Sequence, residues 1–398
     1  MAEQFSFQEE GMKKVLVVLL AVLGLAGLAL AQTTVRVGVL LPISTVAGKA
    51  ALNGVQLGVD QVNAGGKVKI ELVVVDDGNA PAAAVPALTK LMTVDRVDIV
   101  IGGLASGVTF ALSGPVKQYN PLFLCIGAAS SVVEQAFSDY GRFFHYHPWD
   151  YHNVAAALSF FKSLYDGGAR RVAILYEDGP FGSAGIQTYR QQLQNQGYTV
   201  QAEPFKSGSG SFTAILTRLK SFRPDILYWI GYDVDALPIA AQTRQVGLEP
   251  KLIYGAPPAW PLGFEKNNLS NDVAGMTAWL PSVANNESRR FVTLYRRKYN
   301  EITDEYMAPM GYVIALSLGK AVEAANSADK DRIAAELAKV QMDTPFGPLS
   351  FKPSDTGKTR FQGFNQSIWL QFQYLEGSRR PVFPANRAAR PLRYPGNY

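Results

Sequence analysis

Residues 98–131 read DIVIGGLASGVTFALSGPVKQYNPLFLCIGAASS, and this stretch predicts the fold of the whole chain. Two short apolar runs, Asp98–Ile101 and Pro121–Ile126, flank an amphipathic segment of helical length, Val108–Gln118. Short runs rich in β-forming residues that are joined by a helical segment are typical of a β-α-β unit with parallel strands. We therefore expect an α/β protein built around parallel sheets.

Small and hydroxyl-bearing residues follow both predicted strands. Ser106 comes after the first strand, and Ala128, Ala129 and Ser130 come after the second. Ligands of open α/β sheets bind at the carboxyl ends of the strands. Ser106 also falls at the start of the predicted helix, where unpaired N–H groups and the helix dipole favour an anion. Either serine could instead be a helix cap, so the pattern leaves capping and ligand binding open.

The composition excludes several classes of protein. The chain has 398 residues, of which 47% are hydrophobic and 18% charged, as expected for a globular protein of two domains. The net charge of +5 is scattered rather than gathered in a stripe with aromatic residues, which argues against nucleic-acid binding. The single cysteine, Cys125, excludes an internal disulfide. His145 and His147 alternate near Asp150, but the chain has only three histidines, and we expect no metal and no cofactor.

The N-terminus has the pattern of an export signal. Lys13 and Lys14 precede an uninterrupted apolar segment, Val15–Leu30, which ends in the sequence Ala-Leu-Ala. A basic start, an apolar centre and a small-residue end are typical of a cleaved secretory signal, and the segment is short for a membrane span. We expect residues 1–31 to be an N-terminal extension and signal peptide, cleaved after Ala31, and the mature protein to be periplasmic.

Strand-like and helix-like segments then alternate in two successive series, from Val35 and again from Arg171. This predicts two Rossmann-like lobes, each with a parallel sheet. The helices predicted late in the chain need a sheet to cover, so we expect the chain to return to the first lobe. The expected lobes are 32–148 plus 277–363 and 149–276 plus 364–398, joined by a multi-crossover hinge and ending in a polar, Arg-rich tail. Such a cleft suits a small ligand.

Seven segments in the family's order resemble the branched-chain amino-acid-binding proteins of ABC importers, the type I periplasmic binding proteins (leucine/isoleucine/valine-binding family). They are VRVGVLLPIS, VNAGGKVKIELVVVDD, VDIVIGGLASG, PLFLCIGAASS, RVAILYEDGPFG, PDILYWIGYDVDA and TPFGPLSF. The resemblance covers essentially all of the mature chain. It implies a monomer that delivers a small molecule to a membrane ABC permease.

The resemblance also implies residue roles. Ser106 would bind a ligand carboxylate through its hydroxyl and backbone N–H, and the Ala128 carbonyl would accept from an ammonium. Ala129 belongs to the same turn, and Ser130 would reach the carboxylate or the ammonium. An apolar wall would come from three aromatic residues: Phe181, Tyr232 and Tyr312.

One departure from the family concerns the ammonium of an amino acid. The family places an acidic residue after the strand that ends at Gly255, where this chain has Pro257. A buried ammonium without a charged partner loses about 1.5–3 kcal/mol. Either Asp233 or Asp235 replaces the acid, or the ligand lacks an α-ammonium.

We therefore expect an extracytoplasmic solute-binding protein whose ligand is a branched-chain or other aliphatic amino acid. Amides and amine-free carboxylates, including aromatic ones, are the alternative, as is a ligand sensor of the same fold. A sensor is less favoured because no second membrane segment precedes the end of the sequence at Tyr398. An enzyme is not expected, because the chain has neither a Gly-x-Ser-x-Gly pattern around Ser106 nor a Gly-x-Gly-x-x-Gly loop after the first strand.

Overall fold

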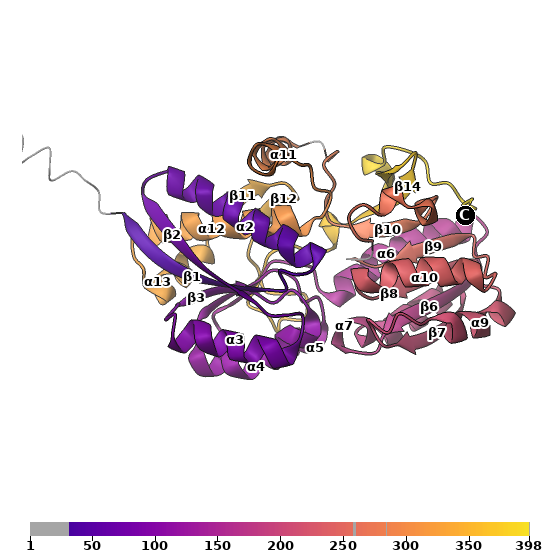
Figure 1. Cartoon of the computed structure of the whole chain (residues 1–398), viewed down its shortest axis with the longest axis horizontal. Helices are drawn as coiled ribbons and strands as arrows, with labels where there is room; N and C mark the ends of the chain where they lie inside the picture. Colours follow the sequence, from indigo (N-terminus) through magenta and orange to yellow (C-terminus); the bar gives the residue numbers. More distant parts are fainter. Residues whose placement is uncertain (1–31, 258–259, 284, 398) are drawn as a thin grey trace, which may run out of the picture.

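The computed structural model describes residues 32–257, 260–283 and 285–397. The predicted signal peptide, residues 1–31, lies outside this part of the chain. Two α/β lobes lie side by side along the longest axis of the molecule (Figure 1). No helix in the described ranges is long and apolar enough to cross a membrane.

The sheet of lobe 1 is six-stranded and parallel, in the order β13-β5-β4-β3-β1-β2. Its strands are β1 (Thr33–Leu41), β2 (Val68–Asp76), β3 (Ile99–Gly102), β4 (Leu122–Cys125), β5 (Phe143–His145) and β13 (Phe361–Gln362). Every residue of β3 and β4 is buried, as expected for a parallel strand that is covered on both faces. The two apolar runs of the 98–131 segment are therefore the centre of this sheet.

Helices cover both faces of this sheet. They are α2 (Val46–Ala64), α3 (Pro81–Thr93), α4 (Ser106–Tyr119), α5 (Ser131–Ala136), α11 (Asn286–Tyr299), α12 (Met307–Ala325) and α13 (Lys330–Leu337), with a hairpin of β11 (Gln341–Thr344) and β12 (Gly347–Ser350). Helices α2 and α12 pack unusually closely, since a Cβ on Gly54 would lie 1.8 Å from the Ala308 carbonyl oxygen. Glycines at such contacts explain why two helices far apart in the sequence can pack backbone to backbone.

Lobe 2 has a seven-stranded sheet in the order β15-β14-β10-β9-β8-β6-β7. The strands are β6 (Arg171–Glu177), β7 (Thr199–Phe205), β8 (Ile226–Ile230), β9 (Leu252–Gly255), β10 (Ala274–Thr277), β14 (Leu370–Leu375) and β15 (Ser378–Phe383). Its helices include α6 (Asp150–Asp166), α7 (Pro180–Ser183), α8 (Ile186–Asn195), α9 (Thr213–Phe222) and α10 (Asp233–Gln245). The sheet is parallel except that β14 runs antiparallel to both β10 and β15.

The predicted polar, Arg-rich tail contains a strand that the sequence analysis did not predict. Residues Ser378–Phe383 form β15, an edge strand that pairs with β14. Pro381 and the neighbouring arginines made the segment look unlike a strand, but an edge strand tolerates proline because one side of it needs no ladder hydrogen bonds.

The chain passes between the lobes three times. It leaves lobe 1 between β5 and α6, returns between β10 and α11, and leaves again between β13 and β14. Figure 1 shows the result, with the orange helices α12 and α13 lying among the indigo elements of lobe 1. We propose lobe boundaries of 32–148 with 277–363 and 149–276 with 364–397, and these sheet memberships support them.

Candidate ligand-binding cleft

The two predicted serines meet at the carboxyl edge of the lobe 1 sheet. Strands β3 and β4 are hydrogen-bonded neighbours, so the segments that follow them lie together. The backbone N–H of Ser130 donates to Oγ of Ser106 at 3.3 Å, and both serines are buried. The Ser106 hydroxyl can still donate a hydrogen bond, because the described residues supply no acceptor for its hydrogen.

The two serines differ in their local role. Ser130 caps α5, because its Oγ accepts from the Val132 N–H at 3.2 Å. Ser106 is the first residue of α4, whose N-cap is Ala105 and has no side-chain cap. The capping alternative is therefore correct for Ser130 and wrong for Ser106. The first-turn N–H groups of α4 lie beside a hydroxyl that does not cap them.

The turn after β4 is held in an uncommon backbone conformation. Ala128 has a φ of 45°, in the left-handed region that few non-glycine residues adopt. Its N–H donates to the Leu104 carbonyl at 2.8 Å, and a Cβ on Gly127 would lie 2.7 Å from the same oxygen. The small residues of this turn let it pack directly on the loop that leads to Ser106. Such strained residues gather at functional sites.

A small cavity lies between the lobes at this edge. Its volume is about 20 Å³, close to what one water molecule needs. Six of the predicted site residues line it, namely Ser106, Ala128, Ala129, Phe181, Tyr232 and Pro257. Five residues that sequence analysis did not assign to the site complete the lining: Leu104, Gly127, His147, Tyr306 and Met307. Ser130 does not line the cavity, but its N–H donates to Ser106, which does.

Lobe 2 contacts the carboxyl edge of the lobe 1 sheet directly through Tyr232. This tyrosine packs against Phe181 with 5.2 Å between ring centroids. Its hydroxyl is hydrogen-bonded to the backbone of Ser106, and burial raises its pKa. A ligand carboxylate that binds the Ser106 N–H would have to displace this hydroxyl, and a ligand larger than water requires the lobes to move apart.

Neither Asp233 nor Asp235 supplies the cavity with the acid that is missing at Pro257. Asp235 faces its own lobe, where it accepts from Ser207 Oγ at 2.6 Å and from the Gly208 N–H at 2.8 Å. Asp233 begins α10 and is half-buried, and burial raises its pKa, but it does not line the cavity. Among the described residues that line the cavity, none carries a carboxylate.

Tyr312 does not reach the cavity. It is fully buried within α12 and packs on Phe291, with 5.4 Å between ring centroids. The cavity is instead lined by Tyr306 and Met307, at the N-terminal end of α12. A helix advances 1.5 Å per residue and turns 100°, so Tyr312 lies about 8 Å further along the helix than Met307. The expectation that Tyr312 lines the cleft is corrected on this geometry.

His147 and Tyr306 form a polar pair in the cavity wall. His147 Nδ1 lies 2.7 Å from the Pro148 carbonyl oxygen, and Nε2 lies 3.1 Å from the Tyr306 hydroxyl. Burial lowers the pKa of His147 to about 4, so the imidazole is neutral at pH 7. The sequence holds a signal for this position, because His147 follows β5 at the same sheet edge as Ser106 and Ala128. In the described ranges no three His, Cys, Asp or Glu side chains form a metal-binding group.

A buried arginine joins the lobes beside the cavity. Arg379 of β15 is ion-paired with Asp304 at 3.1 Å and donates to the Trp260 carbonyl at 2.6 Å. Asp304 and Glu305 belong to the segment that enters α12, and Glu305 is buried. Burial raises the pKa of Glu305 to about 7, an effect that Arg379 partly offsets.

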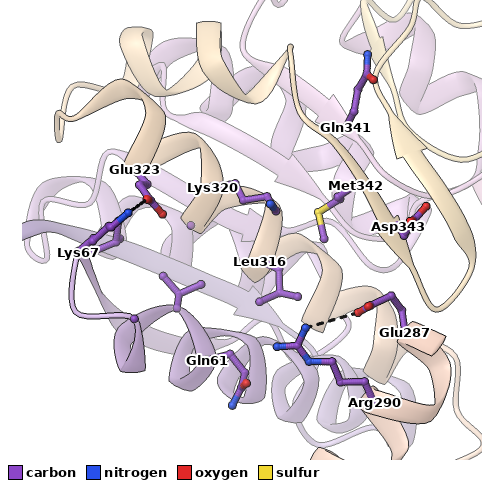
Figure 2. A pocket seen from close by; sticks show the side chains of 14 residues that line it. Gln61, Lys67, Glu287, Arg290, Leu316, Lys320, Glu323, Gln341, Met342 and Asp343 are labelled. Atoms are coloured by element: carbon purple, nitrogen blue, oxygen red, sulfur yellow. Dashed lines mark hydrogen bonds and ion pairs between the residues drawn. The ribbon is translucent and has the colours of Figure 1, made fainter.

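A larger groove lies on lobe 1, away from the cleft (Figure 2). It measures about 590 Å³ and is lined from α2, α11, α12 and β11. Lys67 pairs with Glu323 at 2.6 Å, and Arg290 approaches Glu287 at 4.0 Å. Lys67 and Val68 lie at the amino end of β2, so the groove is at the opposite edge of the sheet from Ser106. None of the predicted site residues lines it.

Two α/β lobes that meet over a buried cavity at their strand ends define the class of two-lobed solute-binding proteins. The chain belongs to the periplasmic binding protein family, whose model matches residues 34–362. The predicted family is confirmed, and the protein is an extracytoplasmic substrate-binding protein that binds a small molecule for an ABC transporter permease.

Individual proteins agree with this assignment. The chain is 22% identical to the leucine-, isoleucine-, valine-, threonine- and alanine-binding protein of Pseudomonas aeruginosa, over 83% of this chain and 89% of the relative. The crystal structure of the leucine-binding protein LivK from Thermotoga maritima matches with a TM-score of 0.76 and 21% identity, covering 87% and 97% of the two chains. A solute-binding protein from R. palustris in complex with benzoate matches with a TM-score of 0.75 and 19% identity, covering 88% and 95%. These structures confirm the predicted fold class.

Proposed function

We propose that the protein captures a small carboxylate-bearing ligand in the interlobe cavity, delivers it to its permease and performs no chemistry on it. The observation that carries this proposal is the position of Ser106 in the cavity wall, with an O–H still available and its backbone N–H at the start of α4. Unpaired N–H groups at a helix start favour an anion.

The cavity chemistry favours a carboxylate without an amine. Pro257 lies where the family places an acid, and the imidazole of His147 is neutral. A buried ammonium would therefore lack a charged partner at a cost of about 1.5–3 kcal/mol. The rings of Phe181 and Tyr232 form a wall that suits a flat or apolar ligand body. Amine-free acids, aromatic ones included, are the ligand class that this geometry supports best.

A branched-chain or other aliphatic amino acid is the second candidate. It is favoured by the relative from Pseudomonas aeruginosa, whose name includes leucine, isoleucine and valine, and by LivK, a leucine-binding protein. The Ala128 carbonyl would then accept from the ammonium. We further propose that the mature protein is a periplasmic monomer, cleaved after Ala31, and a transport receptor rather than a sensor.

The test is a thermal-unfolding series on the mature chain with acids that differ only in the amine. The pairs are phenylalanine with 3-phenylpropionate and leucine with 4-methylpentanoate, with benzoate and benzamide to test the carboxylate. A ligand at 100 times its Kd adds about 2.7 kcal/mol to the stability of the fold. The amine-free member should give the larger shift of each pair. Larger shifts from the amino acids would establish the second candidate, and shifts from neither would contradict the proposal.

Ser106→Ala checks the anion-binding role. Loss of a buried hydrogen bond to a charged group should weaken binding of the best acid by about 1–3 kcal/mol in titration calorimetry. Ser113→Ala is the matched control, because Ser113 lies on the same helix and its hydroxyl bonds only the Phe110 carbonyl. Equal affinities of the two variants would contradict the carboxylate assignment.

A further inference from the structure

Besides Ser106, the cavity wall has a second polar group, the His147–Tyr306 pair. The strands β3, β4 and β5 are consecutive in the sheet, and Ser106, Ala128 and His147 follow them in that order. Neighbouring strands are about 4.8 Å apart, so the Ser106 and His147 ends of the edge are separated by roughly 10 Å. Between them the lining is small or apolar, from Leu104, Ala128 and Ala129. A ligand held by its carboxylate at Ser106 would therefore extend toward His147 and Tyr306.

The hydrogen-bond partners fix the protons of this pair. A carbonyl oxygen can only accept, so His147 Nδ1 carries the hydrogen that is donated to Pro148 at 2.7 Å. A neutral imidazole has one N–H, which leaves Nε2 as an acceptor for the Tyr306 hydroxyl at 3.1 Å. Burial raises the pKa of Tyr306, so its hydroxyl stays protonated and donates. The Tyr306 oxygen then retains lone pairs, for which the described residues supply no donor.

The pair is also held in place from behind. The ring of Trp369 lies edge-on to His147, with 5.4 Å between centroids, and 5.8 Å from the ring of Tyr306. All three side chains are buried, at 2–3% exposure. A buried acceptor in a fixed position discriminates between ligands, because a ligand without a matching donor leaves the acceptor unpaired.

We propose that Tyr306, oriented by His147, recognises a hydroxyl group at the end of the ligand remote from its carboxylate. The proposal rests on the carboxylate site at Ser106 proposed above and narrows the ligand class to hydroxy acids of about the length of an aromatic ring. Tyr306 accepts the ligand hydroxyl's hydrogen while donating its own to His147 Nε2. Tyr306 is thus the contact residue, and His147 is a positioning residue.

The experiment compares two acid pairs that differ only in the remote hydroxyl, 4-hydroxybenzoate with benzoate and tyrosine with phenylalanine. Titration calorimetry on the mature wild-type chain should show the hydroxylated member of the pair that binds to be about five- to tenfold tighter. Tyr306→Phe should bring this ratio close to one. Tyr198→Phe is the matched control, since it removes a buried hydroxyl that bonds the Phe161 carbonyl in lobe 2, and it should keep the wild-type ratio.

The outcomes separate this inference from the proposed function. If both members of a pair bind and their ratio is the same in wild type and Tyr306→Phe, the role of Tyr306 is refuted while the carboxylate site stands. If none of the four acids binds, the ligand class fails and the role of Tyr306 fails with it. A ratio that falls equally in Tyr306→Phe and Tyr198→Phe would show a general effect of stability and would also refute the role.

Discussion

The two lobes line the same cavity with different chemistry. Lobe 1 contributes strand ends, the Ser106 hydroxyl, whose hydrogen has no acceptor among the described residues, and the neutral His147–Tyr306 pair. Lobe 2 contributes large or rigid side chains, namely the rings of Phe181 and Tyr232 and the side chain of Pro257. Both surfaces are carboxyl edges of mainly parallel sheets, so the difference comes from the residues after the strands and not from the topology.

The lobes also differ in whether their polar groups are already paired within the protein. Asp235 of lobe 2 accepts hydrogen bonds from Ser207 and Gly208 of its own lobe and is not available to a ligand. In lobe 1 the hydrogen-bonding groups at Ser106 and Tyr306 keep unused capacity. If the proposed function is correct, lobe 1 recognises the charge of the ligand and lobe 2 its shape. Four predictions follow from this comparison. Two concern the junction between the lobes, and two concern the binding of a ligand.

The largest effect is expected from breaking the ion pair between the lobes, in which Arg379 is buried and Asp304 is half-buried. Arg379→Met would leave Asp304 and Glu305 without their buried cation. Removing one partner of a buried pair costs about 3–5 kcal/mol, which urea unfolding of the mature chain would measure. Arg218→Met removes the exposed pair with Glu203 and should cost less than about 1 kcal/mol. Similar losses in the two variants would show that Arg379 does not stabilise the junction.

The same junction predicts a pH dependence. Burial raises the pKa of Glu305 from 4.5 to about 7, so the folded state holds this proton more tightly than the unfolded state does. The resulting stabilisation is complete below pH 4.5 and is lost as the pH rises through 7. Glu305→Gln stays neutral, so it should gain about 2–3 kcal/mol relative to wild type between pH 4.5 and 7.5. A difference that stays constant with pH would mean that Glu305 is ionised in the folded protein throughout.

Adding an acid to lobe 2 should change the ligand preference. Pro257→Glu would place a carboxylate in the wall that now lacks one, and a charged hydrogen bond to an ammonium is worth about 1.5–3 kcal/mol. Phenylalanine should gain affinity over 3-phenylpropionate by that amount in titration calorimetry. Pro257→Gln controls for the loss of proline and the added volume. If the glutamine variant shifts the preference as much, charge is not the cause.

The smallest effect is expected at the contact between the lobes. The Tyr232 hydroxyl is hydrogen-bonded to the backbone of Ser106, where a ligand carboxylate would bind. Tyr232→Phe keeps the ring and removes this competitor, so benzoate should bind about 0.5–1.5 kcal/mol more tightly in titration calorimetry. Weaker binding would instead show that the hydroxyl contacts the ligand and that lobe 2 takes part in polar recognition.

Much of the architecture follows from the sequence alone. The apolar runs of residues 98–131 are two central strands, and the Gly-Ala-Ala-Ser turn comes beside Ser106 because neighbouring parallel strands end at one edge. The local pattern is sufficient to predict these neighbours, because β-α-β connections are short and right-handed. The edge strand β15 was missed, since its pairing with β14 outweighs the poor local preference of Pro381.

The tertiary structure decided which side chains complete the cavity. Tyr312 and Tyr306 lie on the same apolar stretch, and only the packing of α12 on α2 determines that Tyr306 reaches the cleft while Tyr312 packs on Phe291. His147 and Tyr306 are 159 residues apart, and no local pattern predicts a hydrogen bond across that separation. The sequence determined the strands and the turns at their ends, because these depend on nearby residues. The contacts between distant segments depend on how whole helices and lobes pack, and these contacts decide which side chains line the cavity.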